Sequence, residues 1–297
     1  MEKTMNIKQA KKQTKISNYV NKGGIYLFLT IVAIFMMIPF YWMIITALKS
    51  EAEILLTPPS LFPSELHFEN FGLAMEKANL LRYIMNTLIV AGVSTLIGTI
   101  FSIMVAFALS RLNFKGKDLI FTILLATMMI PGEMMVLTNY ITVSRFGWVG
   151  GEAVAGGNYL AMIVPFLISI SHIYLLRQNF KQIPNELYYA AKVDGVGDWK
   201  YLWKVMVPMA KSSIITIVIL KLMGAWNSYV WPNLVAGDKY RLITNGLRSA
   251  FSNSDTGDTQ FHLQMAATII VTLPLLIVFI FFRKYIMSGV SRSGIKG

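Results

Sequence analysis

Six long apolar stretches divide this 297-residue sequence, and they constrain its fold more than any other feature. A helix needs about 20 apolar residues to cross the hydrocarbon core of a bilayer, and each stretch approaches that length. They cover residues 25–48, 84–109, 119–141, 159–176, 214–231 and 265–282. Only 14% of the residues are charged, whereas a soluble domain carries about 25%. The sequence therefore predicts an all-α membrane protein with six transmembrane helices.

The distribution of Lys and Arg predicts how these spans are oriented. Cytoplasmic loops of membrane proteins are enriched in these two residues. If the N-terminus is cytoplasmic, 19 of the 27 Lys and Arg residues lie on the cytoplasmic side. Both termini are therefore expected in the cytoplasm. The net charge of +12 then reflects membrane topology, and no nucleic-acid partner is expected.

The first 24 residues form a basic arm that holds six Lys. We interpret the arm as a determinant of topology that also contacts anionic lipid head groups. The apolar run after it is too long for the core of a signal peptide, and no small-residue cleavage site follows it. We therefore expect a retained span, and one transmembrane domain over residues 25–297 that ends in a cytoplasmic tail, residues 283–297.

Several kinds of site lack the residues they need. The sequence has no Cys and only three scattered His, so neither thiol chemistry nor a metal site is expected. It contains no GxxxxGK[ST] phosphate loop, so the chain is expected to bind no nucleotide or other cofactor itself. A membrane-embedded enzyme would need a cluster of acid, base, nucleophile or metal ligands, and no such cluster is visible.

The segment between the fourth and fifth stretches, residues 177–211, is too long for a simple turn. Pro184 suits the start of a helix, and Asp194-Gly195 is a strong turn signal. A second short amphipathic run ends at Pro208. We predict two short helices joined by a glycine turn across the cytoplasmic end of the bundle. They would either rest on lipid or dock a cytoplasmic partner.

The same segment carries a family resemblance that other motifs support. Residues 183–195, IPNELYYAAKVDG, resemble the EAA loop of binding-protein-dependent ABC importer permeases, and more closely the carbohydrate, maltose-type branch. Five further motifs fit that family in the same order, at residues 86–91, 130–133, 173–177, 225–232 and 289–297. The resemblance covers residues 24–297. One position departs from the pattern, since Tyr189 stands where the family has Glu.

The resemblance implies a permease subunit that imports a sugar or oligosaccharide across the bacterial cytoplasmic membrane. Its implied partners are a second homologous permease, two cytoplasmic ATP-binding subunits that use ATP and Mg, and an extracytoplasmic substrate-binding protein. The residues implied to couple to the ATP-binding subunits are Pro184, Glu186, Ala190, Ala191, Asp194 and Gly195. Tail residues Gly294, Lys296 and Gly297 are implied to contact the same subunits, and a frayed terminus is the alternative.

Two ionisable residues lie inside predicted spans, where such residues are functional candidates. Glu133 follows Pro131-Gly132, a break that is tolerated only beside protein or a water-filled cavity. Lys221 shares a helical face with small residues and should point into the bundle. A Glu133–Lys221 ion pair is one interpretation. Packing and hydration of the interior is the interpretation that we prefer for Lys221.

The end of the fifth stretch supplies the other candidates for a translocation path. Trp226, Asn227 and Tyr229 combine aromatic faces, which stack on pyranose rings, with an amide that serves hydroxyl groups. The competing interpretation is an aromatic belt at the membrane interface.

A stand-alone secondary transporter of a small polar solute is the alternative function. Such a protein would normally show internal repeats and more intramembrane carboxylates or broken helix pairs for ion coupling. We therefore expect an ATP-coupled permease subunit and not an enzyme.

Overall fold

The computed structural model describes residues 2–150, 154–251 and 260–291, and within these ranges it contains helices and no strand. The long helices are α1 (Glu2–Ala47), α4 (Leu80–Arg111), α12 (Lys211–Trp226) and α15 (Phe261–Ser291). The shorter helices are α2 (Glu51–Ile54), α3 (Glu69–Lys77), α5 (Lys117–Thr127), α6 (Val136–Arg145), α7 (Gly157–Ile163), α8 (Ile170–Lys181), α9 (Asn185–Val193), α10 (Asp198–Tyr201), α11 (Val207–Met209), α13 (Val230–Val235) and α14 (Ile243–Ala250). Single 3-10 or π turns are η1 (Gly132–Met135), η2 (Val164–Phe166), η3 (Leu202–Met206) and η4 (Asp238–Tyr240). The prediction of an all-α protein is confirmed.

Among the described residues, three helices are long and apolar enough to cross a membrane by themselves, namely α1 from residue 22, α4, and α15 up to residue 284. Three further helix pairs meet the same test when each bent pair counts as one span. They are α5 with η1–α6, bent by 89°, α7–η2 with α8, bent by 45°, and α10–α11 with α12, bent by 82°. Each predicted stretch thus coincides with a long helix or a bent pair. The count of six spans and the cytoplasmic termini stay predictions.

Breaks interrupt the third and fourth predicted spans. The break expected at Pro131 is present, because proline has no N–H to donate and Pro131 adopts an extended ψ of 132°. The fourth stretch breaks between Phe166 and Ile170, which we did not predict. Neither stretch is therefore one straight helix.

Helix α12 ends before the predicted end of the fifth span. α12 ends at Trp226, because the Asn227 side chain donates to the Met223 carbonyl at 2.9 Å and closes the last turn. The chain becomes helical again only at Val230, in α13. The predicted end of this span at Trp231 therefore lies within α13.

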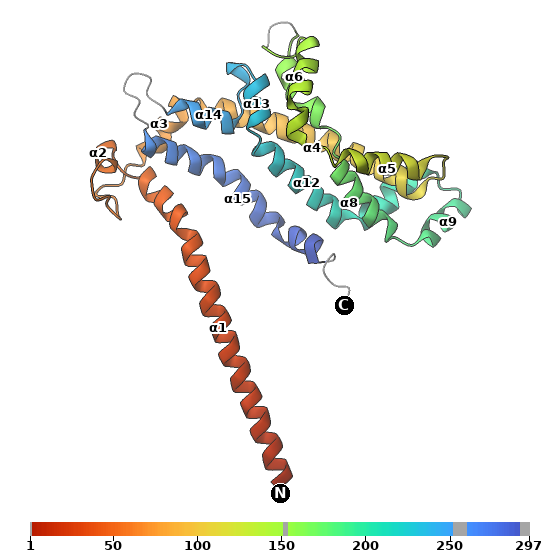
Figure 1. Ribbon diagram of the computed structural model, residues 1–297, viewed down its shortest axis with the longest axis horizontal. Coiled ribbons are helices and arrows are strands. Elements are labelled where there is room, and N and C mark those ends of the chain that lie inside the picture. Colours follow the sequence, from red (N-terminus) through yellow and green to blue (C-terminus); the bar gives the residue numbers. More distant parts are fainter. Residues whose placement is uncertain (1, 151–153, 252–259, 292–297) are drawn as a thin grey trace.

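α1 stands apart from the other helices. Figure 1 shows its C-terminal end beside α15 and the rest of the helix projecting away. Every residue from 22 to 42 is exposed, so this apolar surface is available to lipid or to another subunit. The helix continues without a break across residue 24. The predicted basic arm and the first predicted span therefore lie on one continuous helix.

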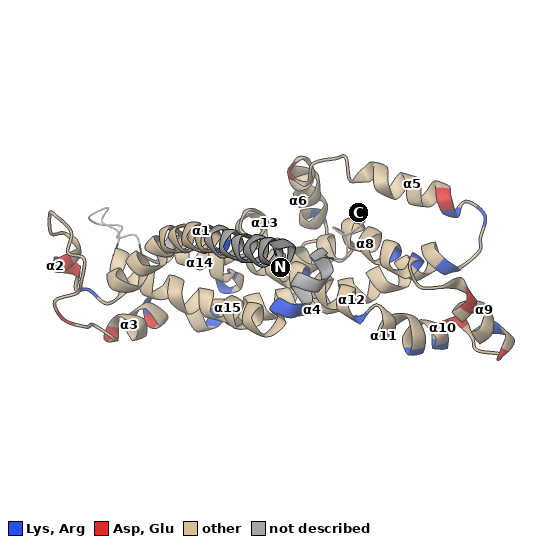
Figure 2. Cartoon of the chain, turned by 90° about the horizontal axis from the view of Figure 1, so that it is seen from below, with Lys and Arg blue, Asp and Glu red and all other residues tan. Residues whose placement is uncertain are grey.

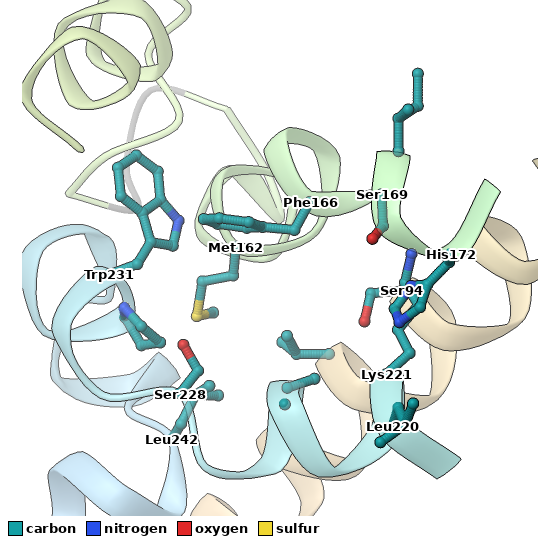
Figure 3. Close-up of a pocket in the computed structure, with 15 residues that line it drawn as sticks. Ser94, Met162, Phe166, Ser169, His172, Leu220, Lys221, Ser228, Trp231 and Leu242 are labelled. Atoms are coloured by element: carbon teal, nitrogen blue, oxygen red, sulfur yellow. The ribbon is translucent and has the colours of Figure 1, made fainter. Parts of the chain in front are cut away.

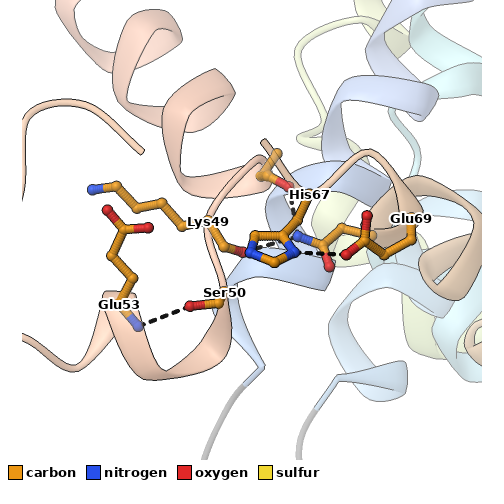
Figure 4. A network of polar contacts seen from close by, with 7 residues as sticks. Lys49, Ser50, Glu53, His67 and Glu69 are labelled. Carbon is orange, nitrogen blue, oxygen red and sulfur yellow. Dashed lines mark hydrogen bonds and ion pairs between the residues drawn. The ribbon is translucent and has the colours of Figure 1, made fainter. Parts of the chain in front are cut away.

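Polar contacts close the end of the molecule where α1, α2 and α3 meet (Figure 4). Ser50 caps α2 by accepting a hydrogen bond from the N–H of Glu53 at 3.2 Å. The Asn70 side chain of α3 donates to the carbonyls of Ala47 (3.0 Å) and Lys49 (2.9 Å). Because the end of a helix leaves carbonyls without partners, these bonds fix α1 to α3.

The opposite end carries α8 to α11, where Figure 2 shows Lys and Arg residues in blue alongside the acidic residues of α9 and α10 in red. The basic residues include Arg177, Lys181, Lys200, Lys204 and Lys211. By the charge rule this end is expected in the cytoplasm. A buried cluster joins α4, α8, α10–η3 and α12 here, through residues such as Phe107, Leu176, Phe180, Tyr201 and Met206. The short helices are thus part of the packed bundle.

Candidate functional site

The segment of residues 177–211, called loop 177–211 below, folds as two short helical units around a glycine turn. α9 begins after Pro184, whose ψ of 140° lets the chain turn into the helix. Gly195 follows α9 with φ of +73°, in the left-handed region that favours glycine. The N–H of Val196 donates to the Ala191 carbonyl at 2.8 Å, which closes the helix as in a Schellman motif. The two predicted helices and the glycine turn between them are confirmed.

Two buried arginines fasten loop 177–211 to the bundle. Arg111, at the end of α4, donates to the Phe180 carbonyl at 2.7 Å and also to the Ile183 carbonyl. Arg177, near the end of α8, donates in return to the Leu109 carbonyl of α4 at 3.1 Å. Each arginine satisfies carbonyls that the C-terminus of the other helix leaves free. The start of α9 is therefore tied to both α4 and α8.

The outward face of α9 carries exposed apolar side chains beside the carboxylate of Glu186. Leu187, Tyr189 and Val193 are 41%, 61% and 88% exposed, and Ala190 is exposed beside them. Ala191 is half-buried and packs against the core. The other predicted coupling residues, which are all exposed, are Pro184, Glu186, Asp194 and Gly195. The helix therefore presents hydrophobic side chains to its surroundings on a fixed mount.

The inward face of α9 is tied to α10. Tyr188 packs edge-on against Tyr201 with ring centroids 5.1 Å apart, and its hydroxyl donates to Asp198 at 2.6 Å. Lys192 lies 2.8 Å from the same carboxylate. The hydrogen bond from Lys192 lowers the pKa of Asp198, and the same bond raises the pKa of Lys192. Both groups therefore stay charged near neutral pH.

A cavity of about 420 Å³ lies between α4, the break before α8, and α12–α13 (Figure 3). Its polar side is formed by Ser94, Ser169, His172 and Lys221. Its less polar side is formed by Met162, Phe166, Ser228 and Trp231. These residues come from three segments far apart in the sequence. No local pattern could have grouped them.

Lys221 is buried and points into the bundle, as predicted. It is 9% exposed, and its ammonium donates to the Leu167 carbonyl at 2.8 Å, at the break before α8. The ammonium lies directly over Gly98 of α4. A Cβ at Gly98 would lie 1.8 Å from the Lys221 Nζ and 2.5 Å from the Leu167 oxygen, so only glycine leaves room for this contact.

Glu133 lies elsewhere, exposed in η1 between α5 and α6. The chain bends by 89° at this break, so Glu133 lies away from the helices that surround Lys221. Among the ion pairs within the described ranges, none joins Glu133 to Lys221. The hypothesis of that ion pair is therefore corrected.

Trp226 is 3% exposed and packs against Ile243 and Val271. Its ring is thus part of the core, which corrects the prediction that it offers a face to a sugar. Trp231 of the same motif lines the cavity instead. Its indole N–H donates to the Ala161 carbonyl at 3.0 Å, which holds the ring in one orientation.

The polar residues of this motif are largely engaged at helix ends. Asn227 is exposed and uses its amide to close α12 through Met223. The Tyr229 carbonyl accepts a hydrogen bond from the Asn245 side chain at 3.0 Å. Ser228, which we did not single out, lines the cavity. The motif therefore reaches the cavity through residues other than those predicted.

The tail residues Gly294, Lys296 and Gly297 lie outside the described residues. Among the residues that are described, His, Asp and Glu side chains form no group that could hold a metal ion.

The sequence matches the family of binding-protein-dependent transport system inner membrane components over residues 98–292. This match includes loop 177–211 and three of the four residues on the polar side of the cavity, Ser169, His172 and Lys221, whereas Ser94 lies before it. The chain belongs to this family. As a permease, it is an integral membrane subunit of a transport system and not an enzyme, because a separate subunit hydrolyses ATP. The secondary-transporter and membrane-enzyme interpretations are thereby set aside.

Known relatives agree with this assignment. The diacetylchitobiose uptake system permease protein of Streptomyces coelicolor is 28% identical over 260 residues, which cover 88% of this chain and 84% of the relative. A crystal structure of a bacterial ABC transporter involved in the import of the acidic polysaccharide alginate is similar with a TM-score of 0.79. It is 22% identical and covers 91% of this permease and 96% of that chain.

A second solved structure shows the bacterial alginate ABC transporter in complex with an alginate pentasaccharide-bound periplasmic protein. It is 17% identical with a TM-score of 0.59, covering 87% of this permease and 92% of that chain. At these identities, the two solved structures establish the fold of the permease, that of ABC importer permeases.

Proposed function

We propose that this permease imports a sugar or oligosaccharide across the bacterial cytoplasmic membrane. It works beside a second homologous permease, two cytoplasmic ATP-binding subunits that use ATP and Mg, and an extracytoplasmic substrate-binding protein. The name of the Streptomyces relative, which takes up diacetylchitobiose, supports a carbohydrate substrate. The alginate transporter in complex with its periplasmic protein supports the binding-protein partner.

The observation that carries the proposal is the set of exposed apolar side chains on α9, a helix that Arg111 and Arg177 fix to the bundle. A helix that only rests on lipid needs no rigid link to the bundle. A helix that receives a push from an ATP-binding subunit does need one, because the displacement must reach the transport pathway. The structure of loop 177–211 therefore favours docking over lipid contact.

The link continues from the loop to the cavity. Displacement of α9 acts on Arg111 at the end of α4. Helix α4 also carries Gly98 and Ser94 beside the cavity. Closure of the ATP-binding subunits would thus shift one wall of the cavity against α8 and α12. We place the translocation path along this cavity, with Lys221 in its wall. Trp231 then has the role that was predicted for Trp226, which is to offer an aromatic face to a sugar. Glu133 remains a predicted candidate for the path, and Gly294, Lys296 and Gly297 remain predicted contacts with the ATP-binding subunits.

Purification from the native membrane tests the proposal. A tagged chain should come out of detergent with a second permease and two ATP-binding subunits. In proteoliposomes with the binding protein, uptake of at least one sugar from a panel should require ATP on the cytoplasmic side. A lone chain that takes up solute from an ion gradient without ATP would overturn the proposal.

A further inference from the structure

The cavity between α4, α8 and α12–α13 has two chemically different sides. The ammonium of Lys221 and the side chains of Ser94, Ser169 and His172 gather on one side (Figure 3). Phe166 and Trp231 form an edge-to-face pair at the other, with ring centroids 5.7 Å apart. A volume of about 420 Å³ lies in the range of small-ligand sites. The cavity can therefore hold a molecule with a charged group and a ring.

Lys221 brings a positive charge that the described part of the chain does not neutralise. An ammonium has three N–H donors, and the structure shows one donated, to the Leu167 carbonyl at 2.8 Å. No Asp or Glu lines the cavity, and none of the ion pairs formed within the described ranges includes Lys221. A buried charge without a counter-ion is costly. The site is therefore favourable for an anion.

His172 has hydrogen-bonding capacity to spare, because its Nδ1 is buried without a partner among the described residues. The hydroxyls of Ser94 and Ser169 lie on the same side of the cavity, but both are already engaged, Ser94 donating to the Ala91 carbonyl at 3.3 Å and Ser169 bonding to the Ser171 hydroxyl at 3.0 Å. The Leu167 carbonyl and the bare backbone of Gly98 hold the Lys221 ammonium in place. These groups form a preorganised polar site, because its charge is positioned before a ligand arrives.

The aromatic side of the cavity is also fixed. The Trp231 indole N–H donates to the Ala161 carbonyl at 3.0 Å, and this hydrogen bond fixes the orientation of the ring. The rings of Phe166 and Trp231 can cover the apolar face of a sugar ring while the charged group of the sugar reaches the Lys221 ammonium on the other side of the cavity. A neutral sugar would leave Lys221 without a counter-ion.

We propose that this cavity is a subsite for the anionic group of an acidic sugar, with Lys221 binding its carboxylate or phosphate and Phe166 and Trp231 packing against its ring. The inference rests on the proposed function, since it names the class of substrate that the importer carries. The two sources of the anion, a uronic acid and a sugar phosphate, share the same negatively charged oxygens and differ in size and charge.

The test uses the complete importer with its binding protein and ATP in proteoliposomes. Uptake is measured for digalacturonate, for galactobiose as its neutral counterpart, and for glucose 6-phosphate. The variants are Lys221→Met, which keeps the length of the side chain, and Lys221→Arg, which keeps the charge. Lys115→Met removes an exposed lysine that is remote from the cavity lining and serves as the matched control.

We expect the wild-type importer to take up at least one of the two anionic sugars. Lys221→Met should lower that uptake by about tenfold or more, as expected for a lost charge-assisted hydrogen bond, while Lys221→Arg retains more of it and Lys115→Met all of it. If the wild-type importer takes up galactobiose, Lys221→Met should take it up equally well. That result would show that Lys221→Met is folded. Which anionic sugar is carried distinguishes a uronate site from a phosphate site.

Three outcomes would overturn the inference. The wild-type importer could carry galactobiose and neither anion, Lys221→Met could leave anion uptake unchanged, or it could lower neutral and anionic uptake equally, as for a purely structural lysine. Failure of the proposed function looks different, because the wild-type importer would then take up no sugar with ATP.

Discussion

Loop 177–211 and the cavity are built in opposite ways. The loop is one continuous stretch of chain whose helices are closed by their own turns, as at Gly195, and whose mount is two buried arginines. The cavity is assembled from three separated segments that meet where Lys221 crosses Gly98 and bonds to Leu167. The first region suits the transmission of a displacement as a unit. The second suits a change of shape when one segment moves against the others.

Disrupting the glycine turn should give the largest functional effect. In Gly195→Trp, a bulky residue enters a left-handed position (φ +73°) next to the docking face, where its Cβ meets no other atom. The fold should survive, but ATP hydrolysis should no longer drive uptake. Uptake should fall by about tenfold or more, within the range of coupling energies between sites. Uptake and ATPase activity in vesicles check this.

Gly156→Trp is the matched control for that experiment. Gly156 also has a positive φ (+75°) and open space around its Cβ position, but it lies at the start of α7, outside loop 177–211. Normal uptake by Gly195→Trp would remove the docking role of the loop. An equal loss in both variants would attribute the effect to backbone strain alone.

The crossing of Lys221 and Gly98 should be the most sensitive point for stability. In Gly98→Ala, the new Cβ would overlap the Lys221 Nζ and approach the Leu167 oxygen to 2.5 Å. The lysine tip can move, but the carbonyl belongs to the backbone, so α4 must shift. Overpacking of this kind costs about 1–3 kcal/mol. Thermal unfolding of the purified complex measures it.

A second glycine of α4 provides the comparison for Gly98. Gly92 is exposed and its Cβ position is open, so Gly92→Ala should be neutral or stabilise the helix by up to about 1 kcal/mol. The double variant Gly98→Ala/Lys221→Met should recover only part of the loss, because the contact with Leu167 remains. Full recovery would mean that the lysine alone requires glycine at this position.

Sequence patterns predicted the loop better than the cavity, and the reason is the range of the interactions. Pro184 and Gly195 act on neighbouring residues, so the helix, its turn and its exposed face follow from local sequence. Arg111 was counted only as a topology charge, because its bond to the Phe180 carbonyl depends on how α4 meets α8.

The misassignment of Trp226 has a similar cause. Its orientation depends on where α12 ends, and that end is set by the amide of Asn227. Pro165 lies in η2, directly before the break at residues 167–169, so a local signal for the break was present and we did not use it. Because we did not predict this break, we could not predict the partner of Lys221 or the polar side of the cavity.

A charge on the docking face should have an intermediate effect. Val193 is 88% exposed, so Val193→Asp leaves the packing of α9 intact while placing a carboxylate where an apolar contact is expected. Binding of the ATP-binding subunits should weaken by about five- to tenfold, as for removal of one apolar contact residue. Val193→Leu keeps the contact apolar and should bind normally. Unchanged binding by Val193→Asp would favour lipid as the neighbour of this face.

The smallest effect is expected inside loop 177–211, at the Lys192–Asp198 pair. Asp198→Asn removes the charge, but both side chains are partly exposed, at 40% and 42%, and such pairs contribute little. Because folding lowers the pKa of Asp198, its contribution is present above the unfolded pKa of about 3.9 and is lost only as the pH falls through the folded pKa. Uptake by wild type and by Asp198→Asn should therefore be equal near neutral pH, with Glu65→Gln as the control for an exposed carboxylate outside the loop. A loss as large as that of Gly195→Trp would show that the loop is held together by this ion pair and not by its turn and its arginine mount.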